Sequence, residues 1–224
     1  MQDKGSAWFG TYVLRSSSPP QDGEEHVTWA SEDLPMRSHE EFVITAAQIS
    51  KAPSKAAGEK IAKKSGIRGL PGLCRVRSLD YACSAPWEWF HLFLENVIPN
   101  LVDLWTGQFK GLESPVNEFR ITANVWDKIA EETIAAVKHI PTAFVRVLGN
   151  ISINRSQFTT ELWGFWFMYL VPILLKGQFP KNKYYVHACE LGALMKVMLQ
   201  FCITTDELED IELRLQEWVH KYEK

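Results

Sequence analysis

Three side chains that could bind a metal ion or transfer a proton recur at helical spacing between residues 88 and 95. Glu88, His91 and Glu95 lie at positions i, i+3 and i+7, which places them within an arc of about 60° on an α-helix. Carboxylates and an imidazole in one row can contact a divalent metal, or orient a ligand carboxylate through a hydrogen bond. The same spacing is also typical of an ordinary solvated helix face, so the row alone leaves both interpretations open.

Positive charge is concentrated between residues 51 and 77. Eight basic residues face one acidic residue there, which gives this stretch a net charge of +7 in a chain whose total is −3. Lysines and arginines along a helix and loop can neutralise DNA phosphates without reading the base sequence, and the alternative is a solubilising surface helix. The candidate DNA-binding residues are Lys51, Lys55, Lys60, Lys63, Lys64, Arg68, Arg75 and Arg77.

Two other groups have a chemical interpretation that their spacing weakens. His187, Cys189 and Cys202 include metal-ligand types, but they lack the spacing of a compact zinc site, which favours thiols packed in a helical core. A set of aromatic residues could stack on bases, but it covers all sides of one helix, which favours core packing. That set is Trp163, Phe165, Trp166, Phe167 and Tyr169.

The elements that must carry these residues are predicted to be helices. Ser38 to Glu41 and Thr204 to Glu207 have the pattern of capping boxes, so helices should begin there. The first helix is followed by one over 54–64 that stops at Gly66. Apolar periodicity predicts further helices, with a kink or restart at Pro99 inside the first of them. The first covers 87–105 and starts after Pro86, and two others cover 122–138 and 181–200. Between these two lies an apolar helix that is capped at Thr159 and Thr160 and reaches Leu175.

Two of these helices have a predicted buried stripe. In the helix over 122–138 we expect Val125, Ile129, Ile134 and Val137 to face inward. In the helix after Thr204 the stripe comprises Leu208, Ile211, Leu215, Trp218, Val219 and Tyr222. No alternating strand pattern stands out, so the fold class is predicted to be mainly α. We expect an irregular segment over 1–36 and a helical region over 37–224.

Composition limits the class of protein. Apolar residues make up 46 % of the 224 residues and nine are tryptophan, which is enough for a packed core. The four cysteines form no Cys-x-x-Cys pair and the first residues are not those of a signal peptide, which favours free thiols in a reducing compartment. The longest apolar run, 162–175, is too short to span a bilayer. A nuclear or cytoplasmic protein, neither secreted nor membrane-bound, is expected.

Several blocks, taken in order, resemble the catalytic region of CACTA-type (En/Spm-like) DNA transposases of the fungal branch. The likeness covers roughly residues 35–224, and the order and spacing of the blocks make it specific. The blocks are RSHEEF at 37–42, GIRGLP at 66–71, SAPWEWFHLFLEN at 84–96, PNL at 99–101, LWTGQFK at 104–110, WGFW at 163–166, LQF at 199–201 and EWVHKYE at 217–223.

The resemblance implies a DDE-type transposase with a ribonuclease-H-like catalytic fold, in which carboxylates hold two Mg²⁺ or Mn²⁺ ions for strand cleavage and joining. It makes Glu88, His91 and Glu95 the candidate catalytic residues. The chain departs from the family in having Glu88 where an Asp is common, and the family's central sheet and first catalytic Asp lie upstream of the residues present. We therefore expect an internal, mostly helical fragment, with the central sheet largely missing, that does not cut DNA alone.

These features suggest DNA, a full-length transposase or a second copy of the chain as partners. No cofactor is evident in the sequence itself. The absence of a Gly-rich phosphate loop and of a Gly-x-Ser-x-Gly motif argues against a nucleotide-fuelled enzyme or a serine hydrolase. The alternative from a different functional class is a helical protein-interaction module or a non-specific DNA-binding module.

Overall fold

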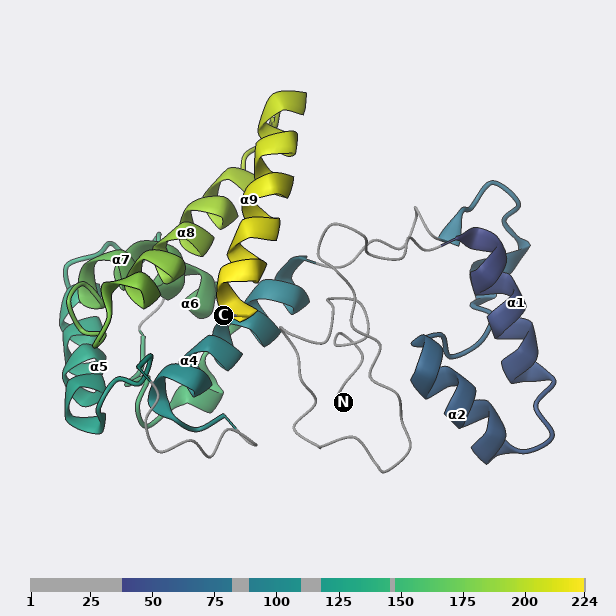
Figure 1. Cartoon of the computed structure of the whole chain (residues 1–224), viewed down its shortest axis with the longest axis horizontal. Helices are drawn as coiled ribbons and strands as arrows, with labels where there is room; N and C mark the ends of the chain where they lie inside the picture. The colour runs from purple at the N-terminus through teal and green to yellow at the C-terminus, as the bar shows by residue number, and fades with distance from the viewer. Residues whose placement is uncertain (1–37, 82–88, 110–117, 146–147, 224) are drawn as a thin grey trace. The chain divides into compact units, whose positions relative to one another are not determined.

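The computed structural model describes residues 38–81, 89–109, 118–145 and 148–223, except the side chains of Cys74 and Arg75. The described residues are mainly helical and contain no strand, which confirms the predicted fold class (Figure 1). They divide into two compact units, 38–81 and 89–223. The predicted irregular segment 1–36, the predicted helix start after Pro86 and the candidate Glu88 all lie outside the described residues.

The first unit contains two helices, α1 (His39–Ser50) and α2 (Lys55–Ser65), and the short 3₁₀-helix η1 (Gly72–Arg75). Both helices begin as predicted. The hydroxyl of Ser38 accepts a hydrogen bond from the Glu41 N–H at 3.1 Å, and the hydroxyl of Ser54 accepts one from Ala57 at 3.2 Å. Helix α2 ends at Gly66, whose φ of 74° lies in the left-handed region that glycine adopts without strain.

Small residues let α1 and α2 pack closely. A Cβ atom on the buried Gly58 would lie 3.4 Å from the Ile49 carbonyl oxygen and 3.6 Å from the Ala52 Cβ, so the space there is filled by a methyl group in ordinary van der Waals contact. Tyr81 then stacks on the ring of Phe42 at 4.7 Å. The backbone N–H of Tyr81 donates to His39 Nδ1 at 3.1 Å. These contacts close the loop that follows α2 back onto α1.

The second unit is built from the remaining helices. None of its helices, nor those of the first unit as described, has the length and apolarity needed to cross a membrane. Their bounds are η2 (Phe90–Val97), α4 (Ile98–Thr106), α5 (Ala123–Val137), η3 (Arg155–Gln157), α6 (Thr160–Phe165), η4 (Trp166–Leu170), α7 (Val171–Leu174), α8 (Asn182–Met198) and α9 (Thr205–Glu223).

The helix that carries the catalytic candidates is not a uniform α-helix. Its first part, η2, is a π-helix, and α4 begins at Ile98 with Pro99 in its first turn. Proline has no N–H to donate, and the first turn of a helix is where that loss costs least. The helix does not break at Pro99, because Val97 and Ile98 keep helical backbone angles and η2 passes directly into α4. The π-helix before Pro99 had no sequence signal.

Tryptophan rings form the centre of the second unit. Trp166 is completely buried and makes edge-to-face contacts with Trp126 at 6.0 Å and Trp163 at 5.9 Å. Its indole N–H donates to the Thr133 hydroxyl at 3.2 Å, and that hydroxyl donates to the Ile129 carbonyl at 2.8 Å. Thr133, the one buried polar side chain of α5, thus has both a donor and an acceptor partner, so its burial costs little free energy.

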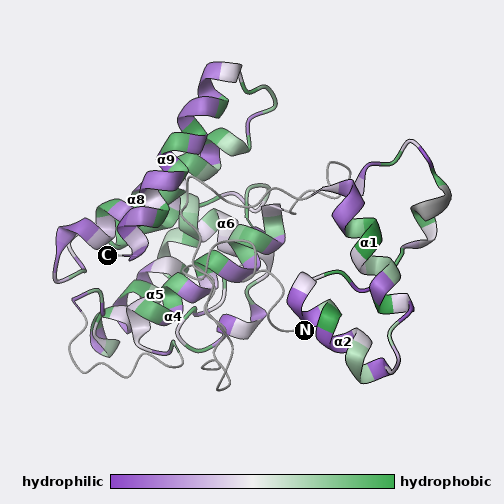
Figure 2. Ribbon diagram, turned by 45° about the vertical axis from the view of Figure 1, so that its right-hand side comes forward, coloured by the Kyte–Doolittle hydropathy of each residue, from purple (hydrophilic) through white to green (hydrophobic). Residues whose placement is uncertain are grey.

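The predicted buried stripes are partly wrong. In α5, Val125 and Ile134 are only half-buried, because Trp126 and Thr133 occupy the core-facing positions beside Ile129. In α9, Leu208 is exposed although Ile211 and Trp218 are buried. The first turn of this helix therefore extends past the core, and Figure 2 shows mostly hydrophilic residues, in purple, along α9.

Candidate functional site

The two described members of the candidate catalytic row lie on the surface. His91 Nε2 is 3.6 Å from Glu95 Oε2, and their side chains are 69 % and 50 % exposed. Residues four apart are neighbours on a helix surface, which accounts for this pair. The row therefore faces solvent rather than a dry apolar interior. Glu88, the third member, lies outside the described residues.

The described side chains of the row do not fit a two-metal site. Mg²⁺ and Mn²⁺ favour six or so oxygen ligands, and the described part of the row supplies one carboxylate and one imidazole. Nowhere among the described residues do three histidine, cysteine, aspartate or glutamate side chains come together closely enough to hold a metal ion.

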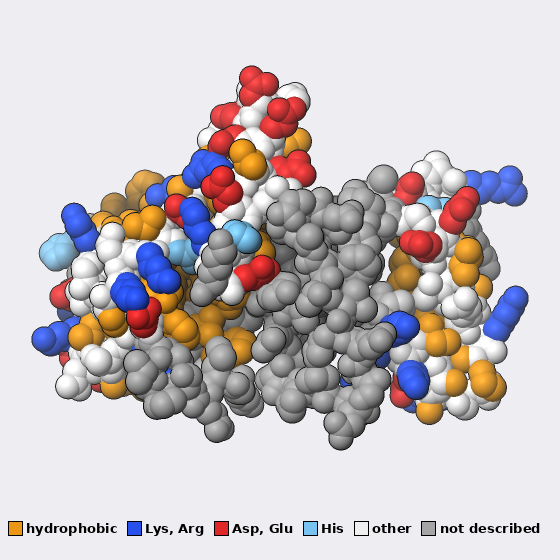
Figure 3. Space-filling view, in the orientation of Figure 1, with side chains coloured by type: hydrophobic (Ala, Val, Ile, Leu, Met, Phe, Trp, Pro, Cys, Tyr) orange, Lys and Arg blue, Asp and Glu red, His pale blue; other side chains and the backbone are white. Residues whose placement is uncertain are grey.

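The candidate DNA-binding residues run from the end of α1 through α2 to the loop after it, in the first unit. The side chains of Lys51, Lys55, Lys60, Lys63, Lys64, Arg68 and Arg77 are all exposed, while that of Arg75 lies outside the described residues. Lys55 Nζ is 3.8 Å from Glu59, the one acid of the stretch, and both side chains are well exposed. Figure 3 shows the blue basic side chains of this unit projecting next to orange hydrophobic ones.

Three of these lysines form one face. On α2, Lys60, Lys63 and Lys64 lie at i, i+3 and i+4, which is an arc of about 100°. The buried Gly58 lies on the other side of the helix. Two of the three lysines also occupy the last turn, where positive charge complements the helix dipole. The sequence thus brings three charges to one solvent-facing surface, as a phosphate contact requires.

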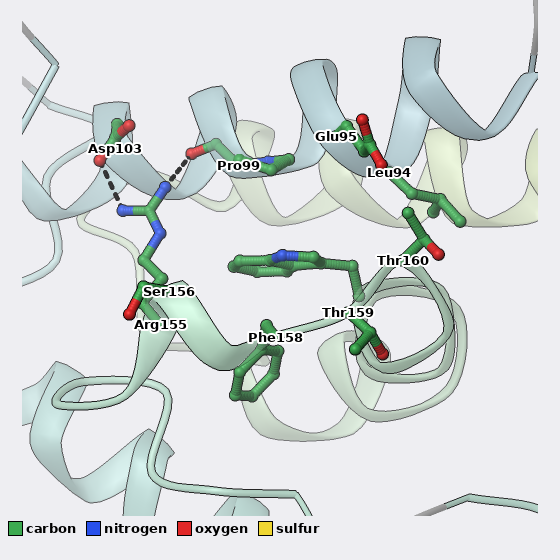
Figure 4. Close-up of a pocket in the computed structure, with 10 residues that line it drawn as sticks. Leu94, Glu95, Pro99, Asp103, Arg155, Ser156, Phe158, Thr159 and Thr160 are labelled. Atoms are coloured by element: carbon green, nitrogen blue, oxygen red, sulfur yellow. Dashed lines mark hydrogen bonds and ion pairs between the residues drawn. The ribbon is translucent and has the colours of Figure 1, made fainter.

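A shallow pocket that sequence reasoning missed lies beside the candidate catalytic row (Figure 4). Its volume is about 500 Å³, and Glu95, Thr160 and the indole of Trp163 are among the residues that line it. At one end, Arg155 Nη1 donates to Asp103 Oδ1 at 2.5 Å. The other guanidinium nitrogen donates to the Pro99 carbonyl. Arg155 follows a poorly patterned segment, and nothing in its local sequence indicates a partner 52 residues away.

Neither interpretation of His187, Cys189 and Cys202 fits fully. No group of metal ligands forms among the described residues, and the expected thiols in a helical core are found only in part, since Cys202 lies after α8. Cys189 is half-buried and Cys202 is exposed, and both are free thiols. The ring of His187 stacks on Trp218 at 4.3 Å, and its Nε2 lies 3.0 Å from the Trp218 carbonyl oxygen. Since a carbonyl only accepts, Nε2 carries the proton. The Trp218 indole donates in return to the His187 carbonyl at 2.9 Å, so this histidine joins α8 to α9.

We expect the stability of the α8–α9 pair to fall when the pH drops below about 6.5. Burial lowers the pKa of His187 in the folded chain, although its bond to the Trp218 carbonyl opposes this. The unfolded chain then binds a proton that the folded chain does not, so the free energy of unfolding decreases with falling pH. The urea midpoint should fall between pH 7 and pH 5.5 in the wild type, and it should fall by less in His187→Gln. An equal loss in both proteins would contradict the assignment.

The aromatic residues of α6 and η4 pack mainly into the core. Trp163, Trp166 and Phe167 are buried and Phe165 is half-buried. Tyr169 is the exposed exception, and Lys196 Nζ lies 4.7 Å from the centre of its ring. Because one exposed ring does not form a series of stacking surfaces, the base-stacking interpretation loses its physical basis among these residues.

Comparison with known proteins gives no relative: no protein-family model, no curated protein and no solved structure matches the chain.

Proposed function

We propose that this chain is a helical, transposase-derived segment that binds DNA phosphates without sequence preference and does not cleave DNA by itself. In this proposal its helices correspond to those of a ribonuclease-H-like transposase of the CACTA type. The sequence blocks between 37 and 223 support that origin. The exposed lysine face of α2 supports the DNA contact, and it is the observation that carries the proposal.

The electrostatics favour a contact confined to this face. Residues 51–77 carry +7, while residues 78–224 carry −5. A DNA duplex would therefore be attracted to the basic stretch and repelled from most of the remaining surface. Phosphate contacts made by lysines position a protein on DNA but carry no base information. The expected binding is weak, independent of sequence and sensitive to salt.

The direct test reverses the charge of the lysine face. We expect Lys60→Glu, Lys63→Glu and Lys64→Glu, combined in one protein, to weaken binding to a labelled 20-base-pair duplex by at least about tenfold at moderate salt. Fluorescence anisotropy with two unrelated duplex sequences measures both the affinity and its independence of sequence.

A matched control separates local contact from net charge. Lys128, Lys138 and Lys176 are exposed lysines of the second unit, and changing all three to Glu alters the total charge equally. This control should lose less than about threefold in affinity, because net charge acts only at long range. Equal losses in the two triple variants would contradict a binding face on α2.

No strand cleavage by the chain alone is expected. The described part of the catalytic row holds one carboxylate, Glu95, beside His91, which is too few oxygen ligands for the two metals of the parent chemistry. Incubation of transposon-end DNA with the chain and Mg²⁺ or Mn²⁺ should leave the DNA intact. Strand-specific nicks that disappear in Glu95→Gln would overturn this part of the proposal.

A further inference from the structure

The connection between α8 and α9 exposes a group of large apolar side chains. We use the name α9 tip for residues 199–213, which comprise this connection and the first half of α9. Phe201 is fully exposed there, and Leu208 and Leu213 are each more than half exposed. In Figure 1 this end of the α8–α9 pair projects from the rest of the second unit. Leu199 and Ile203 complete the exposed set.

The α9 tip is also strongly acidic. Residues 206–212 contain five acidic residues, and residues 199–213 contain no lysine or arginine, so the tip carries −5. Figure 3 shows these carboxylates in red around the outer end of α9. Glu207 caps the start of α9, where its carboxylate accepts a hydrogen bond from the Thr204 N–H at 2.8 Å. Asp206, Glu209 and Glu212 are exposed.

The basic stretch of the first unit has the complementary composition. Its net charge is +7, and the loop after α2 exposes apolar side chains among the cations. These are Leu70, Leu73 and Val76, each between 45 % and 60 % exposed. Exposed apolar residues bordered by charge are typical of interaction sites. One surface is acidic and apolar, and the other is basic and apolar.

We propose that the α9 tip docks on the basic stretch 51–77 of a second copy of this chain. Opposite charge steers the two surfaces together, and burial of the exposed leucines and Phe201 supplies the affinity. The two patches differ, so the contact is heterologous, and every copy offers both halves of it. Because the lysines of α2 take part, DNA and the α9 tip compete for them. Only this competition rests on the proposed function, since the association itself needs no DNA.

Two triple variants test the contact in the absence of DNA. The first is Lys60→Glu, Lys63→Glu and Lys64→Glu, and the second is Asp206→Lys, Glu209→Lys and Glu212→Lys. Sedimentation of the wild-type chain at low salt, with a reductant to keep Cys202 reduced, should give a mass above the monomer. Each variant alone should associate at least about tenfold more weakly. An equimolar mixture should associate again, because each supplies the half that the other lacks.

The equimolar mixture is the decisive arm, because it pairs the intact acidic tip of one variant with the intact basic stretch of the other. A chain carrying all six substitutions has a net charge of +1 on both 51–77 and the α9 tip, so it should stay as weakly associated as either triple variant. Circular dichroism checks that each variant keeps its helices. A wild-type chain that stays monomeric at low salt and high concentration would overturn the proposal. So would a failure of the mixture to restore association in folded proteins.

The same proteins separate this inference from the proposed DNA binding. The variant with the basic α9 tip keeps the lysines of α2, so it should bind duplex DNA at least as tightly as the wild type. Loss of self-association with retained DNA binding supports the contact between copies. Wild-type self-association that the DNA duplex leaves unchanged would contradict the competition while leaving the contact itself supported.

Discussion

Replacement of Trp166 by alanine should destabilise the chain by about 4 kcal/mol, which is the largest effect we expect from one substitution. The indole is completely buried and lies between the rings of Trp126 and Trp163. Its removal leaves a cavity bounded by rigid aromatic neighbours that cannot collapse into it. Urea unfolding followed by circular dichroism measures the change in midpoint.

Two controls distinguish the cavity from the lost hydrogen bond. Trp166→Phe keeps most of the ring but removes the donor to Thr133, whose hydroxyl retains its bond to the Ile129 carbonyl. It should cost less than half as much as the alanine variant. Phe201→Ala removes a fully exposed ring and should change the unfolding free energy by less than about 0.5 kcal/mol. Equal losses for Trp166→Ala and Phe201→Ala would contradict the described core.

Replacement of Arg155 by alanine should cost about 2 kcal/mol, the second largest effect. The side chains of Arg155 and Asp103 are only 22 % and 30 % exposed, so the pair is poorly screened by water. Removal of the guanidinium leaves the Asp103 carboxylate and the Pro99 carbonyl without this donor in a partly desolvated site. It also removes a cation that lies 5.7 Å from the centre of the Trp163 ring.

A conservative variant and a surface pair provide the comparison. Arg155→Lys keeps the charge but not the planar fork that reaches two acceptors, so it should recover only part of the stability. Arg214→Ala breaks an exposed pair with Asp210 on one turn of α9, and it should cost less than about 0.5 kcal/mol. If Arg155→Ala unfolds at the wild-type urea midpoint, the pair does not hold the segment before α6 onto α4.

Local sequence signals predicted the helix ends well. The hydroxyl of Thr204 accepts from the Glu207 N–H at 3.2 Å and the Glu207 carboxylate accepts in return, as the capping-box pattern indicates. Ser38, Ser54 and Gly66 were equally informative, because caps and left-handed glycines act within four residues. The mainly helical class follows from the same local patterns.

Interactions between distant residues could not be predicted in the same way. The partners of Arg155 are 52 and 56 residues away, and helical periodicity says nothing about such pairs. Thr133 also occupies a core position that a polarity pattern assigns to an apolar residue, because Trp166 satisfies its hydroxyl from another helix. The phase of a buried stripe depends on such partners, which explains why the prediction for α5 failed at Val125 and Ile134.

For the candidate sites too, the sequence predicted local arrangement but not the partners that distant residues provide. The sequence predicted that His91 and Glu95 share a helix face, and they form a pair across one turn. It also predicted that the basic residues of 51–77 lie on a helix and a loop, and the described ones do. Their functions stay predictions, because proximity on a surface does not by itself assign a ligand.

The salt dependence of DNA binding tests the central claim most directly. If Lys60, Lys63 and Lys64 contact phosphates, the logarithm of the association constant should fall linearly with the logarithm of salt concentration with a slope of about −3. The slope should lie near zero for the protein in which these three lysines are glutamate. Binding with an equal slope in that variant, or wild-type binding that salt leaves unchanged, would contradict a phosphate contact on α2.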